Sequence, residues 1–187
     1  MTFHDYMRPL MSKITTIIRA LTVEEQQQLK DELLRNYDLW EPHGSNKYNT
    51  MLQDGRSIHV NSVINGKIMH SLFDKFPLTH QILKLVAGDR TIARVYWHKL
   101  EWNDKILPHN DSRLFDVVEN RLDNRYQIYL ECPDNRIMID NRAINSKIFE
   151  NTIVDFDLTQ QHGFVNNSPQ PWVFLVFDVL KPNINFI

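Results

Sequence analysis

The feature that most constrains the fold of this chain is a succession of short apolar runs in its second half. Five runs are rich in β-branched and aromatic residues: 91–100, 125–131, 136–139, 152–156 and 172–180. Asn, Asp, Pro and Ser residues typical of turns separate them, and no long helical pattern intervenes. Short strands without crossover helices favour an antiparallel sandwich or barrel over a parallel α/β sheet. The pattern predicts an α+β fold whose core is a double-stranded β-helix, or jelly roll.

The first third of the chain has a different period and predicts helices. Apolar residues recur there at three- and four-residue steps, as on one buried helix face: Met7, Met11, Ile14, Ile17, Ile18 and Leu21. Thr22 and Glu25 then form the pattern of a capping box, in which each side chain satisfies the other residue's amide. The helix that they open carries Leu29, Leu33 and Tyr37 on one face and is expected to stop near Pro42.

Turns and one more short helix complete this first part. Asp54-Gly55 and Asn65-Gly66 are hairpin signals, because type I′ turns need positive φ at both central residues. A short helix is expected from residue 78 or 79 to Val86, ended by Gly88. We therefore expect one domain over 1–187, with helices and short strands over 1–90 buttressing a jelly-roll core over 91–180.

Composition limits the partners of such a domain. The 187 residues include 21 Lys and Arg against 23 Asp and Glu, so no basic excess exists for binding nucleic acid or an anionic membrane. The longest apolar stretch, 172–180, is too short to span a bilayer and contains Asp178. Cys132 is the only cysteine and has no pattern of a nucleophile. These features predict a cytoplasmic protein without nucleic-acid or membrane partners.

His109-Asn110-Asp111 is the first candidate for chemistry. At the end of an extended strand, residues i and i+2 point to the same side, so His109 and Asp111 can converge on one metal ion. His162 is a suitable third ligand, and two histidines with one carboxylate form the facial triad of non-haem Fe(II) oxygenases. With eight histidines in the chain, a chance His-x-Asp has odds of roughly one in two. The alternative is a polar surface loop.

The context of these residues resembles a known family. The segment 94–100 followed by Ile106-Leu107-Pro108-His109-Asn110-Asp111 looks like the first metal-ligand strand of Fe(II)/2-oxoglutarate-dependent dioxygenases, in the aspartyl/asparaginyl β-hydroxylase-like branch. The segments 151–157 and 161–168 are similar to the distal-histidine region, and 173–179 resembles the closing strand. The resemblance covers about residues 91–180. It implies Fe(II) held by His109, Asp111 and His162, with 2-oxoglutarate and O₂ as co-substrates.

The co-substrate anchor departs from the family pattern. The family usually places an arginine about ten residues after the distal histidine, where this chain has Trp172. Arg125 is a candidate replacement, on one strand face with Gln127 and Tyr129, although it can instead pair with Asp123 on the surface.

Further residues are candidates for contacts with the co-substrate or the prime substrate. His98 lies where the family often keeps a polar co-substrate contact, with a hydrogen-bonded core histidine as the alternative, and Tyr129 is a further co-substrate candidate. Arg113 and Trp172 are candidates for contact with the prime substrate. The branch implies a free amino acid or a peptide side chain as that substrate.

Two other classes of function stay open. One is a degenerate jelly roll that binds a metal ion or ligand without oxygenase turnover, which the missing arginine would allow. The other is a structural or interaction domain, in which the His-x-Asp pattern is a coincidence. Convergence of the two histidines and the carboxylate in space separates the second class from the others.

Overall fold

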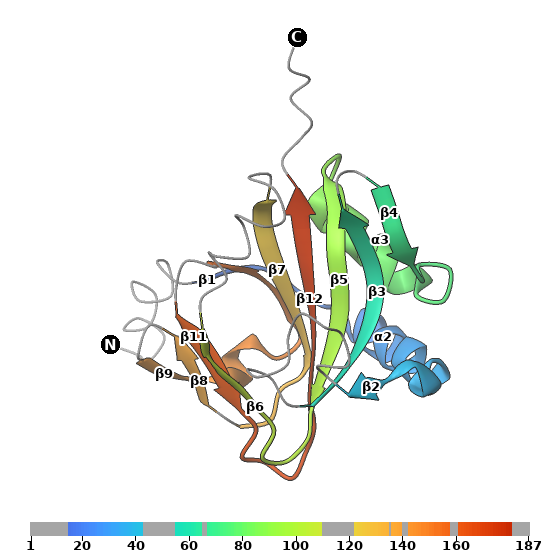
Figure 1. Ribbon diagram of the computed structural model, residues 1–187. Coiled ribbons are helices and arrows are strands. Elements are labelled where there is room, and N and C mark those ends of the chain that lie inside the picture. The colour runs from blue at the N-terminus through green and yellow to red at the C-terminus, as the bar shows by residue number, and fades with distance from the viewer. Residues whose placement is uncertain are drawn as a thin grey trace.

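Antiparallel β-strands make up most of the molecule (Figure 1). The computed structural model describes residues 15–42, 55–64, 67–109, 122–134, 136–139, 142–157 and 161–180. Within these ranges the strands form one sheet of eight and one sheet of four. The two sheets face each other, and α2 and α3 lie on the far side of the larger sheet.

The larger sheet has the strand order β1-β10-β7-β12-β5-β3-β2, and β4 pairs with β3. Its strands are β1 (Thr15–Ala20), β2 (Glu41–Pro42), β3 (Arg56–Ile64), β4 (Lys67–Ser71), β5 (Thr91–Leu100), β7 (Leu122–Glu131), β10 (Thr152–Phe156) and β12 (Trp172–Leu180). β12 lies between β5 and β7 and is buried at every position. This burial on both faces explains why its sequence is an almost continuous apolar run.

The smaller sheet has the order β6-β11-β8-β9. Its strands are β6 (Lys105–His109), β8 (Arg136–Ile139), β9 (Arg142–Asn145) and β11 (His162–Val165). Ile137, Ile139 and Phe164 of this sheet are buried against residues of the larger one. The space between the two sheets is therefore a packed core.

A second core lies on the other face of the larger sheet, because side chains alternate along a strand. On β12, Trp172, Phe174 and Val176 face the smaller sheet. Val173, Leu175, Phe177 and Val179 face the helices. The helices are α2 (Val23–Arg35) and α3 (Pro77–Ala87). The other helical segments in the described ranges are two short 3₁₀ turns, Tyr37–Leu39 and Ser146–Phe149.

The helix signals at residues 22–25 and 88 are confirmed. Thr22 Oγ1 accepts from the Glu25 amide at 3.0 Å, and Glu25 Oε2 accepts from the Thr22 amide at 2.8 Å. α3 ends where Gly88 takes a positive φ of 61°. In the described part of the chain, no helix is long and apolar enough to cross a bilayer.

The prediction of a helix over residues 7–21 is wrong for residues 15–20, the part of this segment that forms a described element. Thr15–Ala20 is the edge strand β1, paired with β10, and residues 7–14 lie outside the described ranges. Ile17 and Ile18 are 42% and 46% exposed, so they do not share one buried face. The β-branched run Thr-Thr-Ile-Ile favours a strand, and pairing with β10 supplies the hydrogen bonds that sequence periodicity does not reveal.

The strands expected in the second half are confirmed, but two further strands, β9 and β11, were missed. Segments 91–100, 136–139, 152–156 and 172–180 are β5, β8, β10 and β12, and 125–131 lies within β7. The Asn65-Gly66 hairpin is supported by the pairing of β3 with β4 on either side of it. β9 and β11 have four residues each, as β8 does, but unlike β8 they contain Asn or Gly, which weakens the signal of an apolar run.

Candidate functional site

Two imidazoles meet where β6 and β11 pair. His109 ends β6 and His162 begins β11, and the two residues are direct register partners. Their ring centroids are 4.4 Å apart and their planes are inclined at 53°. His162 is 3% exposed, whereas His109 is half-buried. Two histidines 53 positions apart in the sequence thus lie side by side.

The surroundings fix the orientation of both rings. Nδ1 of His109 lies 2.7 Å from the Leu107 carbonyl. Because a carbonyl only accepts, Nδ1 carries the proton and the lone pair of the ring is on Nε2. The ring of His162 meets Phe156 edge-on at 4.9 Å and Phe164 at 6.0 Å. A backbone carbonyl on the second nitrogen is typical of metal-binding histidines.

Gly163 allows the two strands to approach each other. A Cβ at this position would lie 3.0 Å from the Pro108 nitrogen and 3.1 Å from the Ile106 carbonyl oxygen. Any other residue would push β11 away from β6 beside the histidine pair. Motif context does not predict this role of Gly163, although a glycine directly after a candidate ligand is a visible signal.

The predicted carboxylate ligand Asp111 and the candidate Arg113 lie outside the described residues. Within the described ranges, no group of three or more His, Cys, Asp or Glu side chains is placed to hold a metal ion. The structure therefore brings together two of the three predicted ligands. Two oriented imidazoles suit a divalent transition metal such as Fe(II).

The inner face of the larger sheet carries the candidate co-substrate residues. Tyr129 is fully buried and its hydroxyl donates to the Gln127 side-chain oxygen. Burial, with a smaller effect of Cys132, raises the pKa of Tyr129 well above its usual value, so the hydroxyl keeps its proton. His98 is 2% exposed and its ring stacks on Phe174 at 5.0 Å.

Arg125 belongs to a buried ion-pair cluster. Its Nε donates to Asp178 Oδ1 at 2.7 Å and its Nη2 to Oδ2 at 3.1 Å. Arg94 Nε donates to the same Oδ2 at 2.7 Å. Arg125 and Asp178 are 4% and 1% exposed. Arg125 is thus an interior residue and not one that pairs only at the surface.

The carboxylate of this cluster is ionised. Burial raises the pKa of Asp178, but the charges and hydrogen bonds of Arg125 and Arg94 outweigh it and hold the pKa below its usual value. In the sequence, Asp178 stands out only as an interruption of an apolar stretch. A charged residue inside a nine-residue apolar strand was the signal for a buried partner.

Trp172 lies deep in the core between the sheets. It is 0% exposed, and its ring contacts Phe164 at 5.4 Å and Phe174 at 6.1 Å between centroids. Its indole Nε1 is buried with no hydrogen-bond partner among the described residues. The position at which the family usually has an arginine is therefore occupied by an uncharged ring.

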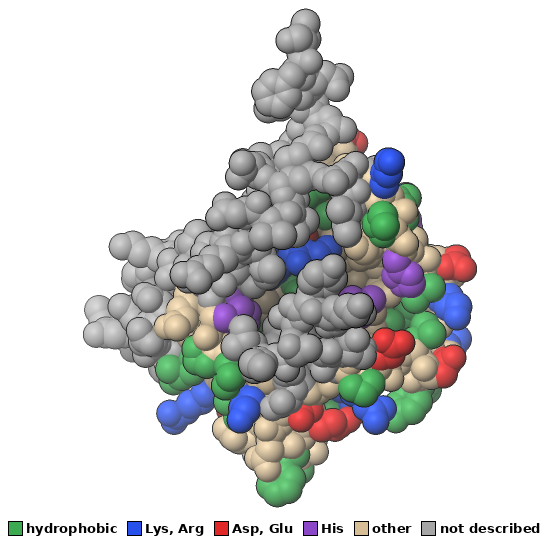
Figure 2. Space-filling view, in the orientation of Figure 1, with side chains coloured by type: hydrophobic (Ala, Val, Ile, Leu, Met, Phe, Trp, Pro, Cys, Tyr) green, Lys and Arg blue, Asp and Glu red, His purple; other side chains and the backbone are tan. Residues whose placement is uncertain are grey.

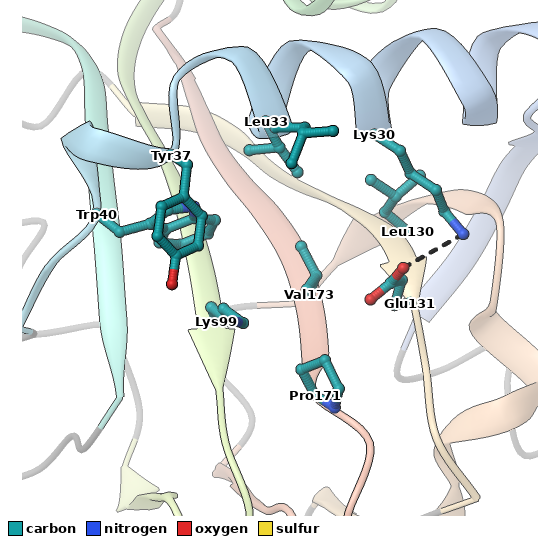
Figure 3. Close-up of a pocket in the computed structure, with 10 residues that line it drawn as sticks. Lys30, Leu33, Tyr37, Trp40, Lys99, Leu130, Glu131, Pro171 and Val173 are labelled. Carbon is teal, nitrogen blue, oxygen red and sulfur yellow. Dashed lines mark ion pairs between the residues drawn. The ribbon is translucent and has the colours of Figure 1, made fainter.

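A groove of about 230 Å³ lies elsewhere, beneath α2 (Figure 3). Leu33, Tyr37 and Trp40 line it from the helical side, and Leu130 and Val173 from the sheet. Lys30 and Glu131 form an ion pair of 3.3 Å beside it. Leu130 and Val173 belong to the helix-facing core, so this groove is separate from the histidine pair.

The two-sheet β-fold, in which two histidines lie side by side where β6 and β11 pair, is similar to the fold of solved 2OG-Fe(II) oxygenases. An oxidoreductase of the 2OG-Fe(II) oxygenase family from Burkholderia pseudomallei is similar with a TM-score of 0.64 and 15% identity, over 98% of this chain and 93% of that chain. A Trichoplax adhaerens prolyl hydroxylase, solved with a hypoxia inducible factor peptide fragment, has a TM-score of 0.64 and 11% identity, over 93% and 86%. A Pseudomonas putida prolyl-4-hydroxylase has a TM-score of 0.58 and 12% identity, over 92% and 96%. At these identities the likeness concerns the fold.

The family follows from the sequence itself. The aspartyl/asparaginyl β-hydroxylase family model matches residues 23–182. The chain belongs to the aspartyl/asparaginyl β-hydroxylase family and is a hydroxylase of the 2OG-Fe(II) oxygenase kind. The match begins at α2. It therefore extends well beyond residues 91–180, whose motifs resemble those of the family. No curated protein matches the chain in sequence.

Proposed function

We propose that this chain is a non-haem Fe(II)/2-oxoglutarate-dependent dioxygenase that hydroxylates an amino acid or a peptide side chain. The observation that carries the proposal is the meeting of His109 and His162, with ring centroids 4.4 Å apart, at the junction of β6 and β11. Family membership over residues 23–182 supports the same reaction class.

His109, His162 and Asp111 would hold the metal ion. His109 is suited to this role because the Leu107 carbonyl leaves its Nε2 as the ligand atom. The aromatic rings around His162 keep its imidazole fixed and limit access of water. When bound, Fe(II) together with 2-oxoglutarate and O₂ supplies the oxidising chemistry of hydroxylation.

Arg125, His98 and Tyr129 are the residues that we propose for the co-substrate. Gln127 and Tyr129 supply a polar pair on the inner face of β7, and Arg125 supplies a guanidinium on the same face. The planar guanidinium suits a carboxylate better than an ammonium does. Trp172, in the usual place of the arginine, would offer only an uncharged N–H.

The prime substrate is proposed to be a small molecule of the amino acid class or a peptide. The similar structures include prolyl hydroxylases, one of them solved with a peptide fragment. Arg113 and Trp172 stay as proposed substrate contacts. Because Trp172 is 0% exposed, contact with it requires a substrate group that reaches the interior.

A second function is favoured by one observation. The uncharged, buried Trp172 replaces the usual co-substrate arginine, as expected of a protein that binds a metal ion or ligand without turnover. Conversion of 2-oxoglutarate distinguishes the two functions.

The test is succinate formation from 2-oxoglutarate with Fe(II) and O₂, without an added substrate. We expect slow succinate formation by the native chain and its loss in His109→Ala and His162→Ala, each with metal affinity reduced about 10-fold or more. His80→Ala, a histidine on α3, is the matched control. Metal binding without succinate would support the non-catalytic alternative, and unchanged metal binding in both variants would refute the site.

A further inference from the structure

An exposed tryptophan, Trp102, lies in the turn that joins β5 to β6. It is 65% exposed, which is uncommon for so large an aromatic residue. Hydrogen bonds hold the turn in place: the Asn103 amide donates to the Asn166 carbonyl at 2.7 Å, and the Asn166 amide donates to the Asp104 carbonyl at 2.9 Å. The Glu101 amide also donates to the Asp104 carboxylate at 2.8 Å. Because the turn is already ordered, binding through Trp102 loses little conformational entropy of the backbone.

The groove beneath α2 suits an aromatic side chain. Tyr37 and Trp40 form one of its walls, and Leu33 and Val173 supply apolar surface between that wall and the Lys30–Glu131 pair (Figure 3). Its volume of about 230 Å³ is small for a drug-sized ligand but accommodates one large side chain. Tyr37 is 58% exposed, so an incoming ring can contact it face to face or edge to face.

The turn and the groove carry complementary charge. Residues 101–104 contain two acidic side chains and no basic one. The charged residues that line the groove are Lys30, Lys99 and Glu131, two cations and one anion. Lys30 and Glu131 pair at 3.3 Å with side chains 43% and 38% exposed. Pairs this exposed contribute little to stability, so an incoming carboxylate can replace the partner of a lysine at little cost.

The turn and the groove also lie next to each other on one molecule. Lys99 lines the groove, and its Nζ lies 2.6 Å from Oε1 of Glu101, where the turn begins. Pro171, another lining residue, follows the β11–β12 connection, which Asn166 ties to the turn. The two connections form the lower tip of the molecule in Figure 1, and Figure 2 shows hydrophobic side chains at this tip. A two-fold axis beside the tip would bring the turn of each copy to the groove of the other, as an isologous dimer requires.

We propose that two copies of this chain associate, with Trp102 of each copy in the groove beneath α2 of the other. Glu101 and Asp104 of each turn then face the lysines of the opposite groove. Two indoles bury at most roughly 300–500 Å², far less than the ~1,200 Å² of a standard stable interface. The dimer is therefore weak, with a Kd on the order of 10–100 μM. This inference concerns assembly and does not depend on the proposed function.

Sedimentation equilibrium of the full chain, at concentrations on both sides of that Kd, measures the association. We expect a reversible monomer–dimer equilibrium that weakens as salt is added, because exposed charges contribute to it. Trp102→Ala is expected to weaken the dimer at least about tenfold, as the loss of an aromatic anchor does. Leu85→Ala removes a 70% exposed apolar side chain from α3 and is the matched control, with no expected effect on association.

A mixing experiment tests that the turn of one copy meets the groove of another. Tyr37→Glu places a negative charge in the groove and leaves Trp102 intact, whereas Trp102→Ala leaves the groove intact. Each variant alone is expected to be largely monomeric. Fluorescently labelled Trp102→Ala mixed with Tyr37→Glu retains one native contact, so we expect the mixed pair to form more tightly than either variant pairs with itself, and less tightly than the native chain.

Each result decides the proposal. A native chain that stays monomeric well above the expected Kd overturns it, and so does unchanged association in Trp102→Ala. A mixture that associates no better than its components separates the turn from the groove and overturns the pairing. Masses that keep rising beyond the dimer overturn the two-fold arrangement, because contacts that do not close build filaments. Should Trp102→Ala alter the turn, Lys30→Glu tests the groove alone and should weaken the dimer about threefold or more; unchanged association there contradicts the charge pairing.

Discussion

Glu32 shows how one side chain joins two helices. It lies on α2 and is 1% exposed. Its carboxylate accepts from the backbone amides of Leu78 and Thr79 at 2.5 and 3.1 Å, and from the Thr79 hydroxyl at 2.7 Å. These amides begin α3, whose own N-cap residue Phe76 makes no side-chain hydrogen bond. Glu32 therefore caps a helix 45 residues further along the chain, where negative charge is favoured.

Glu32→Ala is expected to lower the free energy of unfolding by about 2–3 kcal/mol, because it leaves buried amide donors without an acceptor. Glu32→Gln keeps one acceptor oxygen and should lose less. Denaturant unfolding monitored by circular dichroism measures both. Glu24→Ala, on the exposed face of α2, is the control and should change stability by less than about 0.5 kcal/mol. Equal losses in Glu24→Ala and Glu32→Ala would contradict the capping role.

A substitution of Arg125 tests the proposed co-substrate site. Arg125→Met should weaken 2-oxoglutarate binding about tenfold by removing a buried guanidinium, with Fe(II) affinity unchanged because the histidines are untouched. Calorimetric titration with each ligand separates the two effects. Arg125→Lys keeps the charge and leaves Asp178 paired. Its affinity for 2-oxoglutarate should lie between those of the native chain and Arg125→Met. Unchanged 2-oxoglutarate affinity would exclude Arg125 as the anchor.

Which residues the sequence reveals depends on how local their partners are. The capping box Thr22 and Glu25 was predictable because both partners lie within one helical turn. Glu32 looked like one more polar residue on an exposed face, since its partners are 46 and 47 positions away. His109 and His162 were found through motif context. Asp178 is marked by its place inside an apolar strand, but the identity of its partner Arg94 was not predictable, because an ion pair across 84 positions leaves no local pattern.

At the scale of elements, strands that form a distinct apolar run were predictable, including the four-residue β8, whereas β9 and β11 were not. β5 and β12 have ten and nine residues and their boundaries matched. β11 has four, and its identity as a strand comes from pairing with β6 and β8 on both sides. β1 was mistaken for a helix because apolar spacing alone does not report an edge pairing with β10.

The pairing of β6 with β11 gives an element-scale prediction through Gly163. Gly163→Ala places a methyl group 3.0–3.1 Å from the backbone of Pro108 and Ile106, so the strands must separate. We expect a loss of about 1–3 kcal/mol in stability and a clear fall in Fe(II) affinity, because His162 moves with β11. Chemical denaturation and metal titration measure the two effects. Val165→Ala changes an exposed residue of the same strand and should leave metal affinity intact. If Gly163→Ala binds Fe(II) as tightly as the native chain does, the strand spacing does not position the histidines.

At the scale of the whole molecule, the Arg94, Asp178 and Arg125 cluster ties three central strands together. These residues lie on β5, β12 and β7, which are consecutive in the larger sheet. The rest of that face is held by apolar packing such as Phe174 on Tyr129 at 5.8 Å. The cluster is therefore a point at which charge, and hence pH, acts on the stability of the whole fold.

Asp178→Asn tests this dependence. The pKa of Asp178 in the folded chain is lowered, so its contribution to stability is present above the unfolded value of about 4 and is lost as pH falls through the folded value below that. At pH 7 we expect the variant to be less stable by roughly 3–5 kcal/mol, because the buried guanidinium of Arg125 and the half-buried one of Arg94 lose their counter-charge. Urea unfolding from pH 7 to pH 2.5 should show the difference from the native chain narrowing below about pH 4, where the carboxylate of the unfolded chain binds a proton that the folded one does not. Asp157→Asn, a carboxylate outside the cluster, controls for general acid effects. A difference that stays constant over the whole range would mean that packing at residue 178, and not its charge, stabilises the sheet.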